Sequence, residues 1–221
     1  MSELPLKTIS VVGTDAFDFL QNQLTNDLAL LESEAEILSS WCNPKGRVIW
    51  FGTVQAIESG FALSVAADIA EDVVSRLTVF RFRAKVQFSI DEGGSVDAEF
   101  LIKNGYAFIG REQVEQFTPH MLNLDLLGAV SVDKGCYPGQ EIVARTHYRG
   151  ATKRRLLRFE STEPVSPGDK VSDGERDVGE VLNAAGTNLL AVVPVDKAAG
   201  PLSIGEVSLL NLPLPYLENN N

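Results

Sequence analysis

The pattern of hydrophobic residues changes at Gly150, and this change limits the folds that the chain can adopt. Beyond it, short β-prone runs recur at regular spacing, with Pro-Gly, Asp-Gly and Ala-Gly pairs between them. Such pairs are typical of tight turns, and several short strands divided by turns indicate an all-β unit. The runs are 155–160, 170–171, 178–182, 189–194 and 206–210. We therefore expect a small antiparallel barrel or sandwich over residues 153–221.

The first ninety residues mix strand-like and helix-like patterns. Strand-like runs cover 6–12, 36–41, 47–56, 61–65 and 85–90, and Asn43-Pro44-Lys45-Gly46 predicts a hairpin turn between the second and third. Hydrophobic residues at three- and four-residue spacing predict one helix after Thr14-Asp15 and a second near residue 73; they are Phe17, Leu20, Leu24, Leu28 and Leu31, then Ile69, Val73 and Leu77. The order β-α-β-β-β-α-β predicts a ferredoxin-like unit with one extra strand.

The middle of the chain is less regular. Asp91-Glu92-Gly93-Gly94 predicts a break, and after it 98–103 and 123–128 are candidate short helices. Residues 140–146 follow a Pro-Gly turn and contain good helix formers. We therefore predict an α+β chain with a ferredoxin-like domain at 1–91, a reduced central segment at 92–152 and a β-barrel domain at 153–221.

Bulk properties restrict the class of protein. The chain has 221 residues, 44% hydrophobic and 22% charged, which is ordinary for a globular protein. It contains no apolar run near the roughly 18–20 residues that a membrane span needs. The N-terminus has no basic region followed by an apolar stretch, so no export signal is visible. Two cysteines make no disulfide framework. We expect a soluble, cytoplasmic protein without membrane contact.

The charge is unevenly distributed. The net charge of −11 disfavours nonspecific attraction to nucleic acid or anionic membranes. Residues 142–159 contain six basic and no acidic side chains, namely Arg145, Arg149, Lys153, Arg154, Arg155 and Arg158. This basic strip could hold a polyanion or a carboxylate-bearing ligand, or it could be a solvated face paired with acids elsewhere.

The run KGCYPGQE, residues 134–141, holds the most informative cysteine. If Cys136 lies just before a helix, backbone N–H groups would stabilise its thiolate, and Lys134 would add positive charge. The alternative is a small buried hydrophobic residue, since cysteine is commonly buried and inert. No metal site is predicted, because Cys42, Cys136, His120 and His147 lack metal-ligand spacing. Nucleophile-elbow, Walker A and GxGxxG motifs are absent.

Further polar residues could recognise a planar heterocycle. Glu141 and Arg145 are four residues apart on the predicted helix, so they could pair with each other. Alternatively, Gln140 or Glu141 would form a hydrogen bond with a planar heterocycle, while Arg145 would bind a carboxylate of the same ligand. Four polar residues of the first predicted helix could similarly form hydrogen bonds with the amide-like edge of a ligand. Alternatively, they could face solvent or cap a turn. They are Asn22, Gln23, Asn26 and Asp27.

These residues together resemble a known family. Residues 134–141 match the KGCYxGQE motif of the YgfZ-type folate-binding proteins, relatives of the T-protein of the glycine cleavage system. The resemblance continues through Ile142 to Arg145, Arg149 to Ala151, and Lys153 with Arg154. It includes residues 21–27, 42–47, 117–119, 123–124 and 213–216, so it is scattered over most of the chain.

The resemblance implies a tetrahydrofolate-binding accessory protein that maintains iron–sulfur enzymes. Such enzymes include those that methylthiolate tRNA, whereas direct tRNA contact is left open. The family fold is a ring of two ferredoxin-like units and a C-terminal barrel around a central folate site. By motif, Cys136 would be the functional thiol, and Lys134 and Gly135 would shape its turn. The supporting site would comprise Tyr137, Gln140, Glu141 and Arg145, with Asn22, Gln23 and Asn26 as further folate-binding candidates.

The chain departs from the family pattern in two ways. It is a short form, in which the loss falls between Ile90 and about Glu99 and leaves a remnant of the second ferredoxin-like unit. Leu6 and Asp97 stand where some relatives have pocket tryptophans. Two alternatives to the accessory role are a one-carbon (aminomethyl) transferase, with Asp27, Asp125 or Glu141 as its carboxylate, and an interaction scaffold without a ligand.

Overall fold

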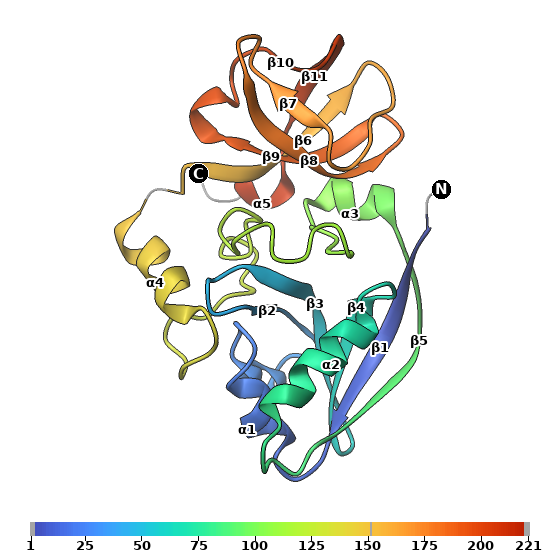
Figure 1. Cartoon of the computed structure of the whole chain (residues 1–221), viewed down its shortest axis with the longest axis vertical. Coiled ribbons are helices and arrows are strands. Elements are labelled where there is room, and N and C mark those ends of the chain that lie inside the picture. The colour runs from blue at the N-terminus through green and yellow to red at the C-terminus, as the bar shows by residue number, and fades with distance from the viewer. Residues whose placement is uncertain (1–2, 151, 219–221) are drawn as a thin grey trace.

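A five-stranded antiparallel sheet and a closed six-stranded barrel form the two ends of the molecule (Figure 1). They are seen in a computed structural model that describes residues 3–150 and 152–218. The sheet has the order β2 (Ile37–Cys42), β3 (Val48–Ile57), β4 (Gly60–Ala66), β1 (Glu3–Val12) and β5 (Gln87–Asp97). The barrel runs β10 (Leu202–Ile204), β11 (Val207–Leu212), β6 (Arg154–Ser161), β9 (Asn188–Pro194), β8 (Asp177–Ala185) and β7 (Lys170–Ser172).

The helices are short and few in the described residues. α1 (Ala16–Gln21), the 3-10 helix η1 (Leu28–Glu32) and α2 (Ala70–Phe80) belong to the sheet unit. α3 (Ala98–Asn104) and α4 (Gln140–Arg149) belong to the middle of the chain, and η2 (Val195–Lys197) and α5 (Pro215–Glu218) to its end. None of the described helices has the length and hydrophobicity that crossing a bilayer would require.

The ferredoxin-like prediction is confirmed by the strand order. β1 pairs with β4 and β5, and β3 pairs with β4, all antiparallel. These pairings give the order of a split βαβ unit, and β2 is the additional edge strand, paired to β3. A buried cluster that includes Ile9, Trp50, Val54 and Leu63 packs one face of the sheet against α1 and α2. The other face is therefore left to contact the middle of the chain.

The predicted barrel is also present. The strand predictions correspond to β6, β7, β8, β9 and β11, and the short strand β10 was not predicted. Alternate residues of β9 divide between two cores, because successive side chains on a strand point to opposite faces. Leu189, Ala191 and Val193 fill the barrel interior, whereas Leu190 and Val192 face the central cluster with Leu156 and Leu182.

The long helix predicted at 14–31 is wrong. α1 ends at Gln21, and the chain then turns into η1. The Gln21 side chain accepts a bond from Leu28 N–H, and Thr25 N–H donates to Ser40 C=O at 2.8 Å. Side-chain and cross-strand bonds therefore replace the helical ladder that the hydrophobic spacing predicted.

The break predicted at residues 91–94 is also wrong. β5 continues through it to Asp97, with Lys7 opposite Glu92 and Glu3 opposite Asp97. Gly93 lies so close to the β1 backbone that a Cβ there would be 2.7 Å from the carbonyl carbon of Lys7. The glycines thus accommodate an irregular register between Pro5 and Lys7 instead of ending the strand.

The two other helix predictions differ in outcome. Residues 98–103 form α3, capped by the Asp97 carboxylate, which accepts from Glu99 N–H at 2.9 Å. Residues 123–128 form turns, starting from Asn123 at φ +59°. A left-handed residue interrupts a helix, so this segment cannot continue as one.

Candidate functional site

The open face of the sheet carries an apolar cavity of about 390 Å³. It lies between β1–β5, α3 and residues 106–109. Its lining residues are Leu6, Glu36, Leu38, Phe51, Gly52, Thr53, Ser64, Ala66, Val96, Phe100, Leu101, Tyr106, Ala107, Phe108 and Ile109. A mostly apolar cavity of this size with a few polar groups is typical of small-molecule sites.

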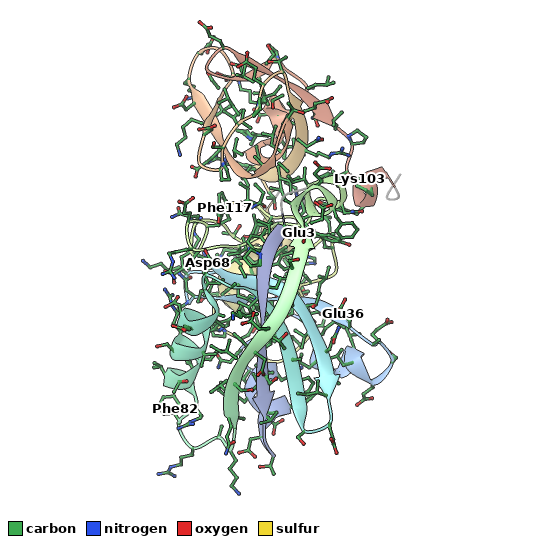
Figure 2. All side chains as sticks on the ribbon, turned by 90° about the vertical axis from the view of Figure 1, so that its right-hand side faces the viewer. Glu3, Glu36, Asp68, Phe82, Lys103 and Phe117 are labelled. Carbon is green, nitrogen blue, oxygen red and sulfur yellow. The ribbon has the colours of Figure 1, made fainter. Side chains whose placement is uncertain are left out.

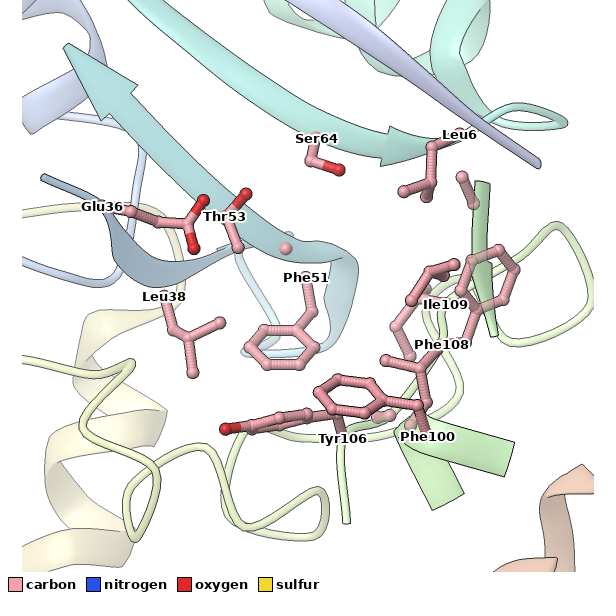
Figure 3. A pocket seen from close by; sticks show the side chains of 15 residues that line it. Leu6, Glu36, Leu38, Phe51, Thr53, Ser64, Phe100, Tyr106, Phe108 and Ile109 are labelled. Carbon is pink, nitrogen blue, oxygen red and sulfur yellow. The ribbon is translucent and has the colours of Figure 1, made fainter. Parts of the chain in front are cut away.

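The lining divides into an aromatic and a polar part. Figure 3 shows the rings of Phe51, Phe100 and Tyr106 gathered in one part of the cavity, with the hydroxyls of Thr53 and Ser64 on strands of the sheet. Phe100 and Tyr106 contact each other with ring centroids 6.5 Å apart. Glu36 is exposed at the edge of the sheet, and its carboxylate accepts a bond from Gln55. A flat ring with N–H groups on its edge would match this combination.

A buried polar cluster adjoins the cavity through β2. Asn26 donates from Nδ2 to the carbonyls of Leu38 and Gly128, at 2.7 and 2.9 Å. The Leu38 side chain lines the cavity, so Asn26 contacts the wall from behind. Thr25 bonds Ser40 and the Ala129 carbonyl in the same layer. These side chains therefore hold the 24–27 loop and residues 128–129 against β2.

Lys134 ties the KGCYPGQE segment to this cluster. Its side chain is buried, with 8% of the residue exposed, and Nζ donates to the carbonyls of Leu24 and Asn26, both at 2.8 Å. Burial lowers the pKa of Lys134 to about 8, although the nearby Asp27 charge opposes the shift. The ammonium also lies 5.6 Å from the ring centroid of Tyr137. Lys134 is thus a clamp on the loop.

The other residues of the segment have separate positions. Tyr137 is buried, which raises the pKa of its hydroxyl. Gln140 donates to the Lys134 carbonyl, while Glu141 and Arg145 form an exposed ion pair with a 3.1 Å contact on α4. Cys136 is exposed on the turn before α4. The thiol is therefore presented to solvent.

The hairpin at residues 43–46 supports the turn that carries the thiol. Asn43 Oδ1 accepts from the backbone N–H of Lys45 and Arg47, at 2.9 and 3.0 Å, and so closes the hairpin. Gly139, at φ +81°, packs directly on this hairpin, where a Cβ would lie 2.6 Å from the Asn43 carbonyl oxygen. The two sequence motifs are consequently in contact.

Several predicted site residues do not lie together. Asn22 and Gln23 line a different hollow, beside α1 and the end of α2, so they are not in the wall of the sheet cavity. Gln140, Glu141, Arg145, Tyr137 and Cys136 are also absent from the lining of that cavity. Leu6 does line the cavity, whereas Asp97 caps α3.

The carboxylates proposed for a transferase are engaged elsewhere. Asp27 accepts from Ala29 N–H and Gln21, and these bonds lower its pKa. Asp125 forms a two-bond ion pair with Arg155, at 2.8 and 2.9 Å. Glu36, which the sequence analysis did not single out, is the acidic residue in the cavity lining.

Three arginines of the basic strip already have partners within the protein. Arg155 binds Asp125, Arg154 donates to the Val178 carbonyl at 2.8 Å, and Arg145 pairs with Glu141. The interpretation as a face paired with acids holds for Arg155 and Arg145, whereas Arg154 bonds a backbone carbonyl. Across the described ranges, no cluster of three or more His, Cys, Asp and Glu side chains is arranged to hold a metal ion.

The cavity residues could have been found by strand alternation. Leu38 and Glu36 on one run, Phe51 and Thr53 on the next, and Ser64 on the third recur at period two. Each set alternates with residues of the helix-covered core. The aromatic residues of 100–108 carried no such signal, because they lie on α3 and an irregular segment.

Comparisons with known proteins agree with this architecture. Residues 153–213 match the family model described as "CAF17, C-terminal beta-barrel domain". An uncharacterized protein of Haemophilus influenzae is 29% identical, with 68% of this chain aligned to 69% of the relative. The tRNA-modifying protein YgfZ of Hamiltonella defensa is 25% identical, with 67% of this chain aligned to 66% of the relative. That of Sodalis glossinidius is 38% identical over 52% of this chain and 40% of its own length.

A solved structure shares nearly the whole fold. The glycine cleavage system aminomethyltransferase T from Bartonella henselae superposes with a TM-score of 0.71, covering 96% of this chain and 84% of that chain at 16% identity. At this identity the likeness concerns the fold alone. The barrel model and the YgfZ relatives together support a YgfZ-type protein, and the shared fold is that of the glycine cleavage T-protein.

Proposed function

We propose that the chain binds a reduced folate, such as tetrahydrofolate, in the cavity on the open face of the sheet, and that it supports iron–sulfur enzymes, including those that methylthiolate tRNA. The observation that carries the proposal is the lining itself. Aromatic side chains cover one part, and Thr53, Ser64 and the Glu36 carboxylate supply hydrogen-bonding groups. A pterin is a flat heterocycle with N–H donors on its edge, so it matches both parts.

The fit is limited to the ring system. None of the residues that line the cavity is cationic, so the described lining does not neutralise the carboxylates of a folate tail. In this proposal Phe100 and Tyr106 pack on the pterin, and Glu36 accepts from its N–H groups. Cys136 is the functional thiol, carried on an exposed turn that Lys134 and Gly139 hold in place.

Titration calorimetry with tetrahydrofolate tests the binding step. The intact chain should bind saturably, and Phe100→Ala and Glu36→Gln should each weaken binding about tenfold, since a charge-assisted hydrogen bond or an aromatic contact contributes roughly 1–3 kcal/mol. Glu34→Gln is the matched control, because Glu34 is exposed nearby and does not line the cavity. Absence of binding at millimolar folate would refute the folate site.

The accessory role is tested separately with Cys136→Ala. This variant should bind folate like the parent chain, since Cys136 does not line the cavity, but cells that carry it should lose tRNA methylthiolation. Arg145→Ala is its companion, as that side chain lies on the helix that follows the turn. Full methylthiolation in cells with Cys136→Ala would remove the role assigned to the thiol.

A one-carbon transferase is the second candidate. The specific observation in its favour is Glu36, a carboxylate among the residues that line the cavity. Turnover of a methylene-tetrahydrofolate donor, lost in Glu36→Gln, would support it. Folate binding without turnover would leave the accessory role as the explanation.

A further inference from the structure

A second hollow lies on the helix-covered side of the sheet, under the segment of residues 79–83 at the end of α2. Its volume is about 380 Å³, and α1 with residues 80–84 forms its lining. This hollow and the folate cavity share no lining residue. Figure 2 shows Phe82 at the end of the molecule opposite the barrel. An inference about this hollow is therefore independent of the function proposed above.

The 79–83 segment exposes apolar side chains to solvent. Val79 is 71% exposed and Phe82 is 89% exposed, and Phe80, which lines the hollow, is 38% exposed. Phe82 has φ +42°, a conformation that bulky residues rarely adopt and that costs about 1–3 kcal/mol. A strained backbone that displays an aromatic ring is a common property of ligand-binding loops.

The same segment carries two free cations. Arg81 and Arg83 alternate with the aromatic residues, and neither forms an ion pair with any side chain in the described part of the chain. Both are exposed. Guanidinium groups in this setting are suited to a phosphate or carboxylate, which they can bond with two parallel N–H groups.

A buried amide contributes the third element. Gln23 lines the hollow, only 8% of it is exposed, and its Oε1 has no hydrogen-bond donor among the described residues. Leaving such an acceptor unpaired costs about 1–3 kcal/mol, so a donor from a ligand would be favourable. The exposed Asp18 carboxylate is a second acceptor in the lining. Asp15, the other acid there, already accepts from Lys85 N–H and Thr14.

We propose that this hollow is a nucleotide site, in which an unpaired base stacks on Phe82, turns its N–H edge toward the acceptors of Asp18 and Gln23, and has its phosphate bound by Arg81 and Arg83. A nucleotide combines a flat apolar face, edge donors and an anionic group. The hollow has the volume typical of small-ligand sites. A free nucleotide and an unpaired nucleotide in a single-stranded RNA present the same groups, and the test below distinguishes them.

Equilibrium binding to the full chain tests this proposal with two probes, the four nucleoside monophosphates and a ten-nucleotide single-stranded RNA of mixed sequence. Phe82→Gly is the main variant, because glycine tolerates φ +42° and should keep or raise the melting temperature. Loss of the stacking contact should weaken binding about tenfold or more. Arg83→Gln should weaken it as well, with Leu210→Ala and Arg176→Gln, on the distant barrel, as matched controls.

The outcomes separate the possible ligands. Binding of monophosphates alone identifies a free nucleotide, and binding of RNA alone identifies an unpaired nucleotide within a strand. Three results would overturn the proposal: no binding of either probe, binding that Phe82→Gly leaves unchanged, or competition by inorganic phosphate as strong as by a nucleotide. Binding to anionic vesicles that Phe82→Gly abolishes would reassign the segment to a membrane surface, and so would also overturn it.

Discussion

The two cysteines differ in what their surroundings allow them to do. Cys42 is fully buried, and burial raises the pKa of its thiol to about 12. Cys136 is exposed on the turn before α4. Because the thiolate is the reactive form and needs access, only Cys136 should react with a disulfide reagent in the folded protein. Thiol titration should count one group in buffer and two in 6 M guanidinium chloride, and none in folded Cys136→Ala. Rapid reaction of two thiols in buffer would contradict the burial of Cys42.

Lys134 gives a prediction with a definite sign. Its folded pKa is about 8, against 10.5 for an unperturbed lysine. Between these values the unfolded chain holds a proton that the folded chain has lost, so the free energy of unfolding rises with pH. Lys134→Met has no such group, and it leaves two carbonyls unpaired, which should cost roughly 1–3 kcal/mol. The advantage of the parent chain over this variant should therefore widen from pH 8 to pH 10.

Urea unfolding of both proteins at the two pH values measures this difference. Using the variant as the reference cancels other titrating groups, among them Tyr137, whose pKa is raised. A constant or narrowing gap would mean that the Lys134 ammonium is not desolvated in the folded state.

At the scale of elements, the docking of α4 depends on a glycine. Gly139 begins the helix at φ +81° and touches the hairpin of residues 43–46. Gly139→Ala would place a Cβ 2.6 Å from the Asn43 carbonyl oxygen, so it should destabilise by about 1–3 kcal/mol or more. Gly135→Ala is the control, since a Cβ there meets nothing within 4 Å. Thermal unfolding measures both variants, and equal melting temperatures for Gly139→Ala and Gly135→Ala would contradict the close contact.

Sequence patterns predicted elements well where one periodicity dominated. α2 follows from helical spacing because it buries one face, and β9, which is buried on both faces, follows from a short apolar run bounded by turn residues. The prediction failed at residues 22–27, where hydrophobic spacing suggested a helix but Thr25 and Asn26 bond residues that are distant in sequence. It failed at residues 91–94 because glycines that read as a break are required by a close strand contact. The cavity was missed in part because Phe100 and Phe108 reach the same cavity wall only through tertiary packing.

At the scale of the whole molecule, the central cluster joins the two ends. It contains Phe51 of the sheet, Ile102 of α3, and Leu182 of the barrel. Asn183 adds two bonds across this junction, accepting from Phe108 N–H at 2.9 Å and donating to its carbonyl at 3.0 Å. A shared core predicts that the sheet unit and the barrel unfold together, although the chain has separate sequence patterns for each.

Leu182→Ala tests this coupling, because the change lies in the barrel and its expected signal lies in the sheet. Leu182 is fully buried, and Leu→Ala substitutions at such sites cost about 2–5 kcal/mol. Both tryptophans of the chain, Trp41 and Trp50, lie in the sheet unit. The tryptophan fluorescence midpoint and the circular dichroism midpoint should therefore fall together in Leu182→Ala. Leu210→Ala, at an exposed barrel position, should leave both midpoints unchanged.

A fluorescence midpoint that stays at the parent value while the dichroism splits into two transitions would mean that the sheet unit is stable without the barrel.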